Sequence, residues 1–211
     1  MQLADSGYRF RVREPETGAI FNETSIPMNT DALLGSWTSL APELRPSATR
    51  NADGSSKPFY LTRHFRYLPD DVFELSIVNA ADPFAKVPLA RIFIRGHMRW
   101  RGPHPIAEGA QKVDFEADEA YEVTPLHQGF AELLNQVASA GYERWVVGGT
   151  QSIFGRAFAP FGLAEGKNFK EFDLVHLRGD LLFWGARHAD GRGFDTEENR
   201  PTNLQIPLAL D

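Results

Sequence analysis

The chain contains no cysteine among its 211 residues. This absence excludes disulfides, zinc–thiolate sites and thiol nucleophiles, and it fits a reducing compartment. The chain also lacks any apolar run near the roughly 18 residues that a membrane helix needs, and residues 1–29 show no basic start followed by an apolar stretch. We therefore expect a cytoplasmic protein without a membrane span.

An excess of basic charge is lacking too, as are the common motifs of cofactor chemistry. The net charge is -6 and the pI is near 5.5, so we expect no nucleic-acid partner. The six histidines are scattered without metal-ligand spacing, and neither Gly-x-Ser-x-Gly nor a glycine pattern for phosphates or dinucleotides is present. The sequence thus predicts no metal and no cofactor.

The composition that remains is typical of a globular protein. Hydrophobic residues make up 42% and charged residues 24% of the chain, which is long enough for one sizeable core. Residues 1–30 are polar and rich in turn formers, so we interpret them as an N-terminal lead-in. Residues 31–211 are expected to form a single β-barrel domain.

Short apolar runs separated by turn residues predict a mainly β, antiparallel architecture. Residues 59–68 and 72–78 are joined by Pro69-Asp70-Asp71, which is typical of a hairpin. Further strands are expected at residues 89–100, 111–123 (as one strand or two), 142–147, 169–177, 181–185 and 204–210. The segment 148–166 fits either a bulged strand or a lid.

One helix is predicted after the fourth of these runs. Thr124 is suited to cap it, Pro125 suits its first position, and Gly141 would end it. Apolar residues recur at helical spacing between these limits, at Leu126, Phe130, Leu133, Leu134 and Val137.

Arg63 is the single charge on an otherwise apolar strand face. Because side chains alternate along a strand, Leu61, Phe65 and Tyr67 share its face, while Thr62, His64 and Arg66 point to the other. A buried guanidinium needs a partner. The partner is either a carboxylate, Glu43 or Asp82, or an anionic ligand.

Two more strands add to the inward wall. Ile92, Ile94, Met98 and Trp100 alternate with a basic set that we expect to be solvated, Arg91, Arg95, His97 and Arg99. Phe73, Leu75 and Ile77 continue the apolar wall, which suits either a filled barrel or an apolar cavity. His176 shares a face with Phe172 and Leu174, a pattern more typical of a hydrogen-bonded core histidine than of a catalytic base.

Several motifs recur in the order of a known family. They are Gly35-Ser36-Trp37, Glu43-Leu44-Arg45-Pro46, Leu61-Thr62-Arg63-His64-Phe65, Ala81-Asp82-Pro83, Arg95-Gly96, Lys112-Val113-Asp114-Phe115, Val123-Thr124-Pro125 and Leu204-Gln205-Ile206-Pro207-Leu208. Together they resemble one barrel domain of the adenomatosis polyposis coli down-regulated family of Wnt inhibitors. Family members carry cysteines near the positions of Pro42 and Ala85, which this chain lacks.

The resemblance implies a lipocalin-like barrel, closed or partly open, with a pocket for an acyl chain. It would bind a hydrophobic or lipid-like small molecule, and Trp37 would pack structurally at the start of the first strand. Arg63 would hold a polar or acidic head group, and the apolar part would be lined by Phe65, Tyr67, Phe73, Trp100 and Trp145.

Two other functions stay open at this point. A cofactor-free cyclase, isomerase or lyase of secondary metabolism is one, because a barrel cavity can fold an apolar substrate with only one or two polar groups acting as acid or base. Its first candidate residues are Arg63, His64 and His176. The other is a protein-interaction domain with a filled barrel, and the sequence leaves the oligomeric state open.

Overall fold

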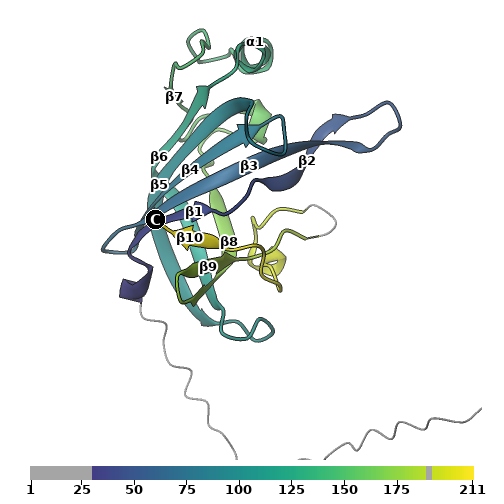
Figure 1. Cartoon of the computed structure of the whole chain (residues 1–211). Coiled ribbons are helices and arrows are strands. Elements are labelled where there is room, and N and C mark those ends of the chain that lie inside the picture. The colour runs from purple at the N-terminus through teal and green to yellow at the C-terminus, as the bar shows by residue number, and fades with distance from the viewer. Residues whose placement is uncertain (1–29, 189–191) are drawn as a thin grey trace, which may run out of the picture.

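The computed structural model describes residues 30–188 and 192–211, so the predicted lead-in falls almost entirely outside the described residues. The described chain forms one antiparallel sheet that curls into a barrel-like ring (Figure 1). The strands are β1 (Gly35–Ser39), β2 (Glu43–Arg50), β3 (Ser56–Tyr67), β4 (Val72–Ala80), β5 (Pro88–Pro103), β6 (Gln111–Pro125), β7 (Gln151–Ser152), β8 (Lys170–Arg178), β9 (Leu181–Trp184) and β10 (Leu208–Leu210). The helical elements are η1 (Thr30–Leu33), α1 (Gln128–Val137), η2 (Ala159–Phe161) and η3 (Glu197–Asn199).

The ring closes because two strands share one edge of β3. Along the sheet the order is β1-β10-β9-β8-β6-β5-β4-β3, and β1 returns to β3 through pairs such as Trp37 with Phe65. β2 pairs with the other end of β3, where Glu43 lies opposite Leu61. The predicted mainly β, antiparallel, barrel-like fold with one α-helix is therefore confirmed.

One end of the barrel is filled by aromatic rings. The ring centroids of Phe65 and Trp184 are 4.0 Å apart, those of Phe115 and Trp184 are 4.6 Å apart, and Phe73 meets Phe115 edge-on at 5.1 Å. These rings are almost completely buried. Aromatic rings bury large areas and gain further from such geometries, so this aromatic core is a main source of stability. Trp37, whose indole N–H donates to the carbonyl of Leu33 at 2.8 Å, packs at the same end, as predicted.

Alternation along β3 and β5 follows the prediction. Leu61, Arg63 and Phe65 point into the ring, whereas the basic residues of β5 point outward. The outward residues are not simply solvated, because Arg95 forms ion pairs with both Glu74 and Glu119. Charge pairs thus cover the outer face of β4, β5 and β6.

The helix begins three residues later than predicted, at Gln128 rather than Pro125. Thr124 and Pro125 are the last residues of β6, since the ladder to β5 continues to the pair of Ala90 with Pro125. The side chain of His127 caps α1 instead, with its Nδ1 accepting from the N–H of Gly129 at 3.1 Å. Tertiary pairing has overridden a local capping signal, and α1 ends at Val137 rather than near Gly141.

The predicted strand at residues 142–147 is wrong. The backbone there bonds to a helix side chain, because Asn135 donates to the carbonyl of Trp145 and accepts from its N–H, both at 2.8 Å. Those groups are no longer free for a β ladder. Of regular elements, segment 148–166 contains β7 and η2. Residues 111–123 belong to one continuous strand, β6. The closing strand, β10, is shorter than the predicted residues 204–210. Within the described residues, no helix combines the length and apolar character needed to cross a membrane.

Candidate functional site

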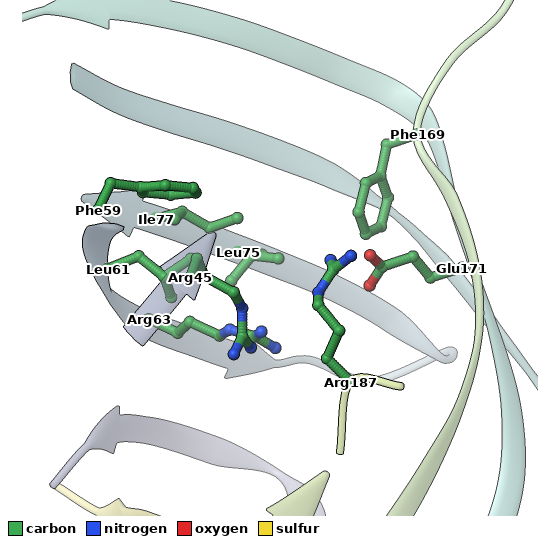
Figure 2. Close-up of a pocket in the computed structure, with 9 residues that line it drawn as sticks. All are labelled: Arg45, Phe59, Leu61, Arg63, Leu75, Ile77, Phe169, Glu171 and Arg187. Carbon is green, nitrogen blue, oxygen red and sulfur yellow. The ribbon is translucent and has the colours of Figure 1, made fainter. Parts of the chain in front are cut away.

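A cavity of about 210 Å³ lies directly above the aromatic core, where the barrel is not filled. Its apolar wall comes from alternate residues of β3 and β4 and from the segment before β8, namely Phe59, Leu61, Leu75, Ile77 and Phe169. Its charged residues are Arg45, Arg63, Glu171 and Arg187 (Figure 2). The hairpin strands β2, β3 and β4 therefore meet β8, the residue before it and the loop after β9 around this cavity.

Arg63 is held in this cavity by Glu43. The Nε of Arg63 lies 3.1 Å from Oε1 of Glu43, and a terminal guanidinium nitrogen donates to Oε2 at 3.2 Å. Arg45 also pairs with Glu43, so one carboxylate serves two guanidinium groups. The alternative partner, Asp82, instead accepts from the N–H groups of Phe84 and Val87 in its own turn. Of the two carboxylates considered from the sequence, Glu43 is the partner.

The opposite wall carries a second pair of charges. Figure 2 shows the guanidinium of Arg187 and the carboxylate of Glu171 pointing toward each other, across the cavity from Arg45 and Arg63. Burial raises the pKa of Glu171, and the three arginines oppose that shift. Three guanidinium groups, of Arg45, Arg63 and Arg187, thus stand against the two carboxylates of Glu43 and Glu171. The resulting excess of positive charge attracts an anion.

Beneath the cavity, three buried side chains that influence one another each carry one polar atom without a hydrogen-bond partner in the described part of the chain. They are Asp173 through Oδ2, Tyr67 through its hydroxyl and Trp184 through Nε1. The other carboxylate oxygen of Asp173 accepts from the N–H groups of Leu174 at 2.7 Å and Gly185 at 3.0 Å. Burial, helped by the charge of Glu171, raises the pKa of Asp173 to about 8. Asp173 can therefore hold a proton at neutral pH.

The Tyr67 hydroxyl responds to the same surroundings. Burial raises its pKa well above the usual value, the charge of Asp173 adds to that rise, and Trp184 and Arg63 oppose it. Arg63 also lies with its guanidinium carbon 5.8 Å from the ring centre of Trp184. Arg63 thus connects the cavity to the buried polar cluster of Asp173, Tyr67 and Trp184.

Glu171 and Asp173 are not among the predicted site residues, because the sequence pattern indicates the wrong face of β8 as the inward one. The apolar pattern of Phe172, Leu174 and His176 predicts that their face points inward, but these side chains point out of the barrel. That outer face is itself covered, with the guanidinium carbon of Arg200 lying 5.5 Å from the ring centre of Phe172. The sequence signal that points to this site is the alternation of the carboxylates Glu171 and Asp173 with the apolar residues of β8.

The other predicted site residues lie elsewhere. Phe65, Tyr67 and Phe73 belong to the aromatic core below the cavity rather than to its lining. Trp100 donates to Asp71 at 3.0 Å in a hollow that it shares with Leu33 and Tyr67, on the far side of the aromatic core from the cavity. Trp145 is buried beneath α1, where its indole N–H donates to the carbonyl of Ala138.

The two candidate histidines are not near Arg63 in the interior. His64 is on the outer face, 3.3 Å from the carboxylate of Asp211. His176 is also on the outer face of β8, against the ring of Phe183 at 6.0 Å, and its Nδ1 has no hydrogen-bond partner among the described residues. The structure brings Arg63 alone of the predicted site residues into the cavity lining.

No group of three or more metal-ligating side chains is found in the residues that the structure describes. No protein-family model matches the chain.

Proposed function

We propose that the protein binds a hydrophobic or lipid-like small molecule with an anionic head group in the barrel cavity. The observation that carries this proposal is the pairing of an apolar wall with an excess of guanidinium groups in one cavity. The resemblance to a lipid-binding barrel domain supports it from the sequence. Cytoplasmic location and the lack of a nucleic-acid partner remain part of the proposal, on the grounds of cysteine content and charge.

The charge balance favours a carboxylate or phosphate head. Glu43 is already shared between Arg45 and Arg63, so each guanidinium has donors left for a second acceptor. Hydrogen bonds to charged groups contribute about 1.5–3 kcal/mol each, more than neutral ones. An anionic oxygen between Arg63 and Arg187 would accept hydrogen bonds from both guanidinium groups.

Competitive binding with two arginine variants tests the proposal. Dodecanoate is the probe, and displacement of a fluorescent fatty acid gives its affinity. Arg63→Ala is expected to weaken binding by roughly 10- to 100-fold, which corresponds to losing one charged hydrogen-bonding partner. Arg99→Ala is the matched control, because its side chain is 62% exposed on the outer face of β5.

Two results would overturn the proposal. One is equal affinity in the two variants, and the other is failure of dodecanoate and of its phosphate analogue to bind the unchanged protein. Native mass spectrometry followed by denaturing extraction adds an independent check, since a bound metabolite that copurifies must be lost with Arg63→Ala.

A second function, cofactor-free acid–base catalysis, is favoured by one specific observation. Asp173 is fully buried, carries an unpartnered oxygen within the described structure, and lies under Arg63 next to Tyr67. A carboxyl that changes its proton near neutral pH suits an isomerase, lyase or cyclase of a biosynthetic reaction. In this alternative Arg63 would hold the substrate, and Asp173 would replace His64 and His176 as the proton-transfer group. Recovery of every bound ligand unchanged after long incubation would eliminate it.

A further inference from the structure

A second, larger hollow lies beside the barrel cavity. Its volume is about 790 Å³, and it shares Phe169 and Glu171 with the cavity that holds Arg63. The two hollows therefore meet at these side chains. We call the larger one the side chamber and define it by Tyr121, Phe161, Leu163 and Phe169 together with its rim.

The side chamber lies where the barrel wall is not hydrogen-bonded. The ladder between β6 and β8 ends with the pair of Glu116 and Lys170, followed by one bond from the N–H of Ala117 to the carbonyl of Phe169. On the same edge of β6 the next partner is Ile153, which donates to Tyr121. β7 and β8 thus pair with different parts of β6 (Figure 1), and no strand of the described chain pairs with the stretch of this edge that lies between the two ladders.

β6 carries a bulge at the level of this unpaired stretch. The pairing of β5 with β6 shifts register between Arg95 and His97, and a Cβ on Gly96 would overlap the backbone carbonyl of Glu116. Only glycine permits that close approach. The side chains of Asp118 and Glu119 turn outward there, to His97 and Arg95.

The floor of the side chamber is aromatic. Tyr121 stacks on Phe161 with centroids 6.2 Å apart and meets Phe169 edge-on at 6.3 Å. Polar side chains, among them Lys167 and Lys170, stand at its rim. An apolar floor with a polar rim is what an acyl chain needs in contact with protein and solvent.

The loop that covers the chamber is held in place by its own hydrogen bonds. Phe158 and Leu163 exchange two backbone bonds, of 2.9 and 3.1 Å, and the side chain of Asn168 accepts from the N–H of Gly155 at 2.6 Å. The hollow is therefore defined by an ordered loop.

We propose that the side chamber binds the apolar tail of the ligand whose head group lies at Arg63. The tail leaves the barrel past Phe169, crosses the edge of β6 where neither β8 nor β7 pairs with it, and lies on Tyr121, Phe161 and Leu163. This inference rests on the proposed binding function. Size supports it, because the barrel cavity at about 210 Å³ is below the roughly 300 Å³ of typical ligand pockets, whereas the side chamber is well within that range.

The absence of cysteine makes the proposal directly testable. Leu163→Cys places one thiol in the side chamber, and Leu133→Cys places a control thiol on the exposed face of α1. The rate of alkylation by a maleimide is measured with hexadecanoate and with hexanoate, each at about ten times its Kd from calorimetry. Mass action leaves about one-eleventh of the protein free, so hexadecanoate should slow the Leu163→Cys reaction about tenfold.

Hexanoate should leave the Leu163→Cys rate unchanged, because its short tail stays in the barrel cavity. The Leu133→Cys rate should change with neither ligand. Once Leu163→Cys is blocked by a bulky maleimide, it should lose most of its affinity for hexadecanoate and keep its affinity for hexanoate.

Hexadecanoate that binds without protecting Leu163→Cys would overturn the tail site and leave the binding function standing. Failure of both probes to bind the unchanged protein would overturn both proposals. Protection by hexanoate equal to that by hexadecanoate would also overturn the tail site, because head and tail would then not be separated as inferred.

Discussion

The buried carboxyl of Asp173 should make the protein less stable as the pH rises through neutrality. The pKa of Asp173 is raised from 3.8 to about 8 by burial and by Glu171. Between these values the native state holds a proton that the unfolded chain has lost. The free energy of unfolding therefore falls with rising pH in this window and levels off above the native pKa.

The size of the effect follows from the shift. One proton held only in the native state changes the free energy of unfolding by about 1.4 kcal/mol per pH unit, so from pH 5 to pH 8 this one group accounts for about 4 kcal/mol. Carboxyls whose pKa is lowered in the native state have the opposite effect, because they make the protein more stable as the pH rises. Burial alone would raise the pKa of Asp114, but hydrogen bonds from Arg200 and Arg101 outweigh burial and lower it.

Asp173→Asn separates Asp173 from those other groups. The asparagine oxygen can still accept from Leu174 and Gly185, and its amide is neutral at every pH in the range. Urea denaturation at unit steps from pH 5 to pH 9 gives the free energy of unfolding of both proteins. The stability of the unchanged protein relative to Asp173→Asn should fall by about 4 kcal/mol between pH 5 and pH 8.

Asp180→Asn, in the exposed turn between β8 and β9, is the control and should follow the unchanged protein at every pH. If Asp173→Asn also follows the unchanged protein, Asp173 is ionised in the native state and the reasoning fails. The same result would remove the basis for acid–base catalysis at this residue.

Two further predictions concern the frame around the site. Arg200 donates to an oxygen of Asp114 at 2.6 Å, and both side chains are buried. Arg200→Ala should therefore lower the free energy of unfolding, measured by urea denaturation, by about 3–5 kcal/mol. A decrease below about 1 kcal/mol would contradict a stabilising role for this pair. Gly96→Ala forces a Cβ into the backbone of Glu116 and should lower the free energy of unfolding by about 1–3 kcal/mol or more. Gly193→Ala is the control, because its Cβ would have its nearest neighbour at 3.6 Å. This variant should change the free energy of unfolding by less than about 0.5 kcal/mol. Equal melting temperatures for the two glycine variants would refute the close packing of β5 on β6.

Local pattern predicted those parts of the fold in which one strand face meets the core and the other meets solvent. On β3 and β5 the period-two alternation is clean, so the inward position of Arg63 and the outward position of Arg95 could be read from the sequence. Glu43 could be named as a partner for Arg63 because a buried guanidinium must be neutralised.

The pattern failed where both faces are buried or where tertiary pairing competes with local signals. On β8, Phe172 and Leu174 are covered from outside, so hydrophobicity no longer distinguishes inside from outside. At Thr124 a good capping residue stays in β6, because the ladder to β5 supplies its hydrogen bonds.

The sequence by itself determined the β architecture, the central arginine and the absence of cysteine chemistry, because composition and alternation are local properties. Only the tertiary structure decided that Arg187 and Glu171 face Arg45 and Arg63 across one cavity. It also decided that aromatic rings fill one end of the barrel, and that β8 and β7 pair with different parts of β6. These features depend on how strands distant in sequence are placed in register, and no local pattern encodes the distance between side chains that meet only when the ring closes.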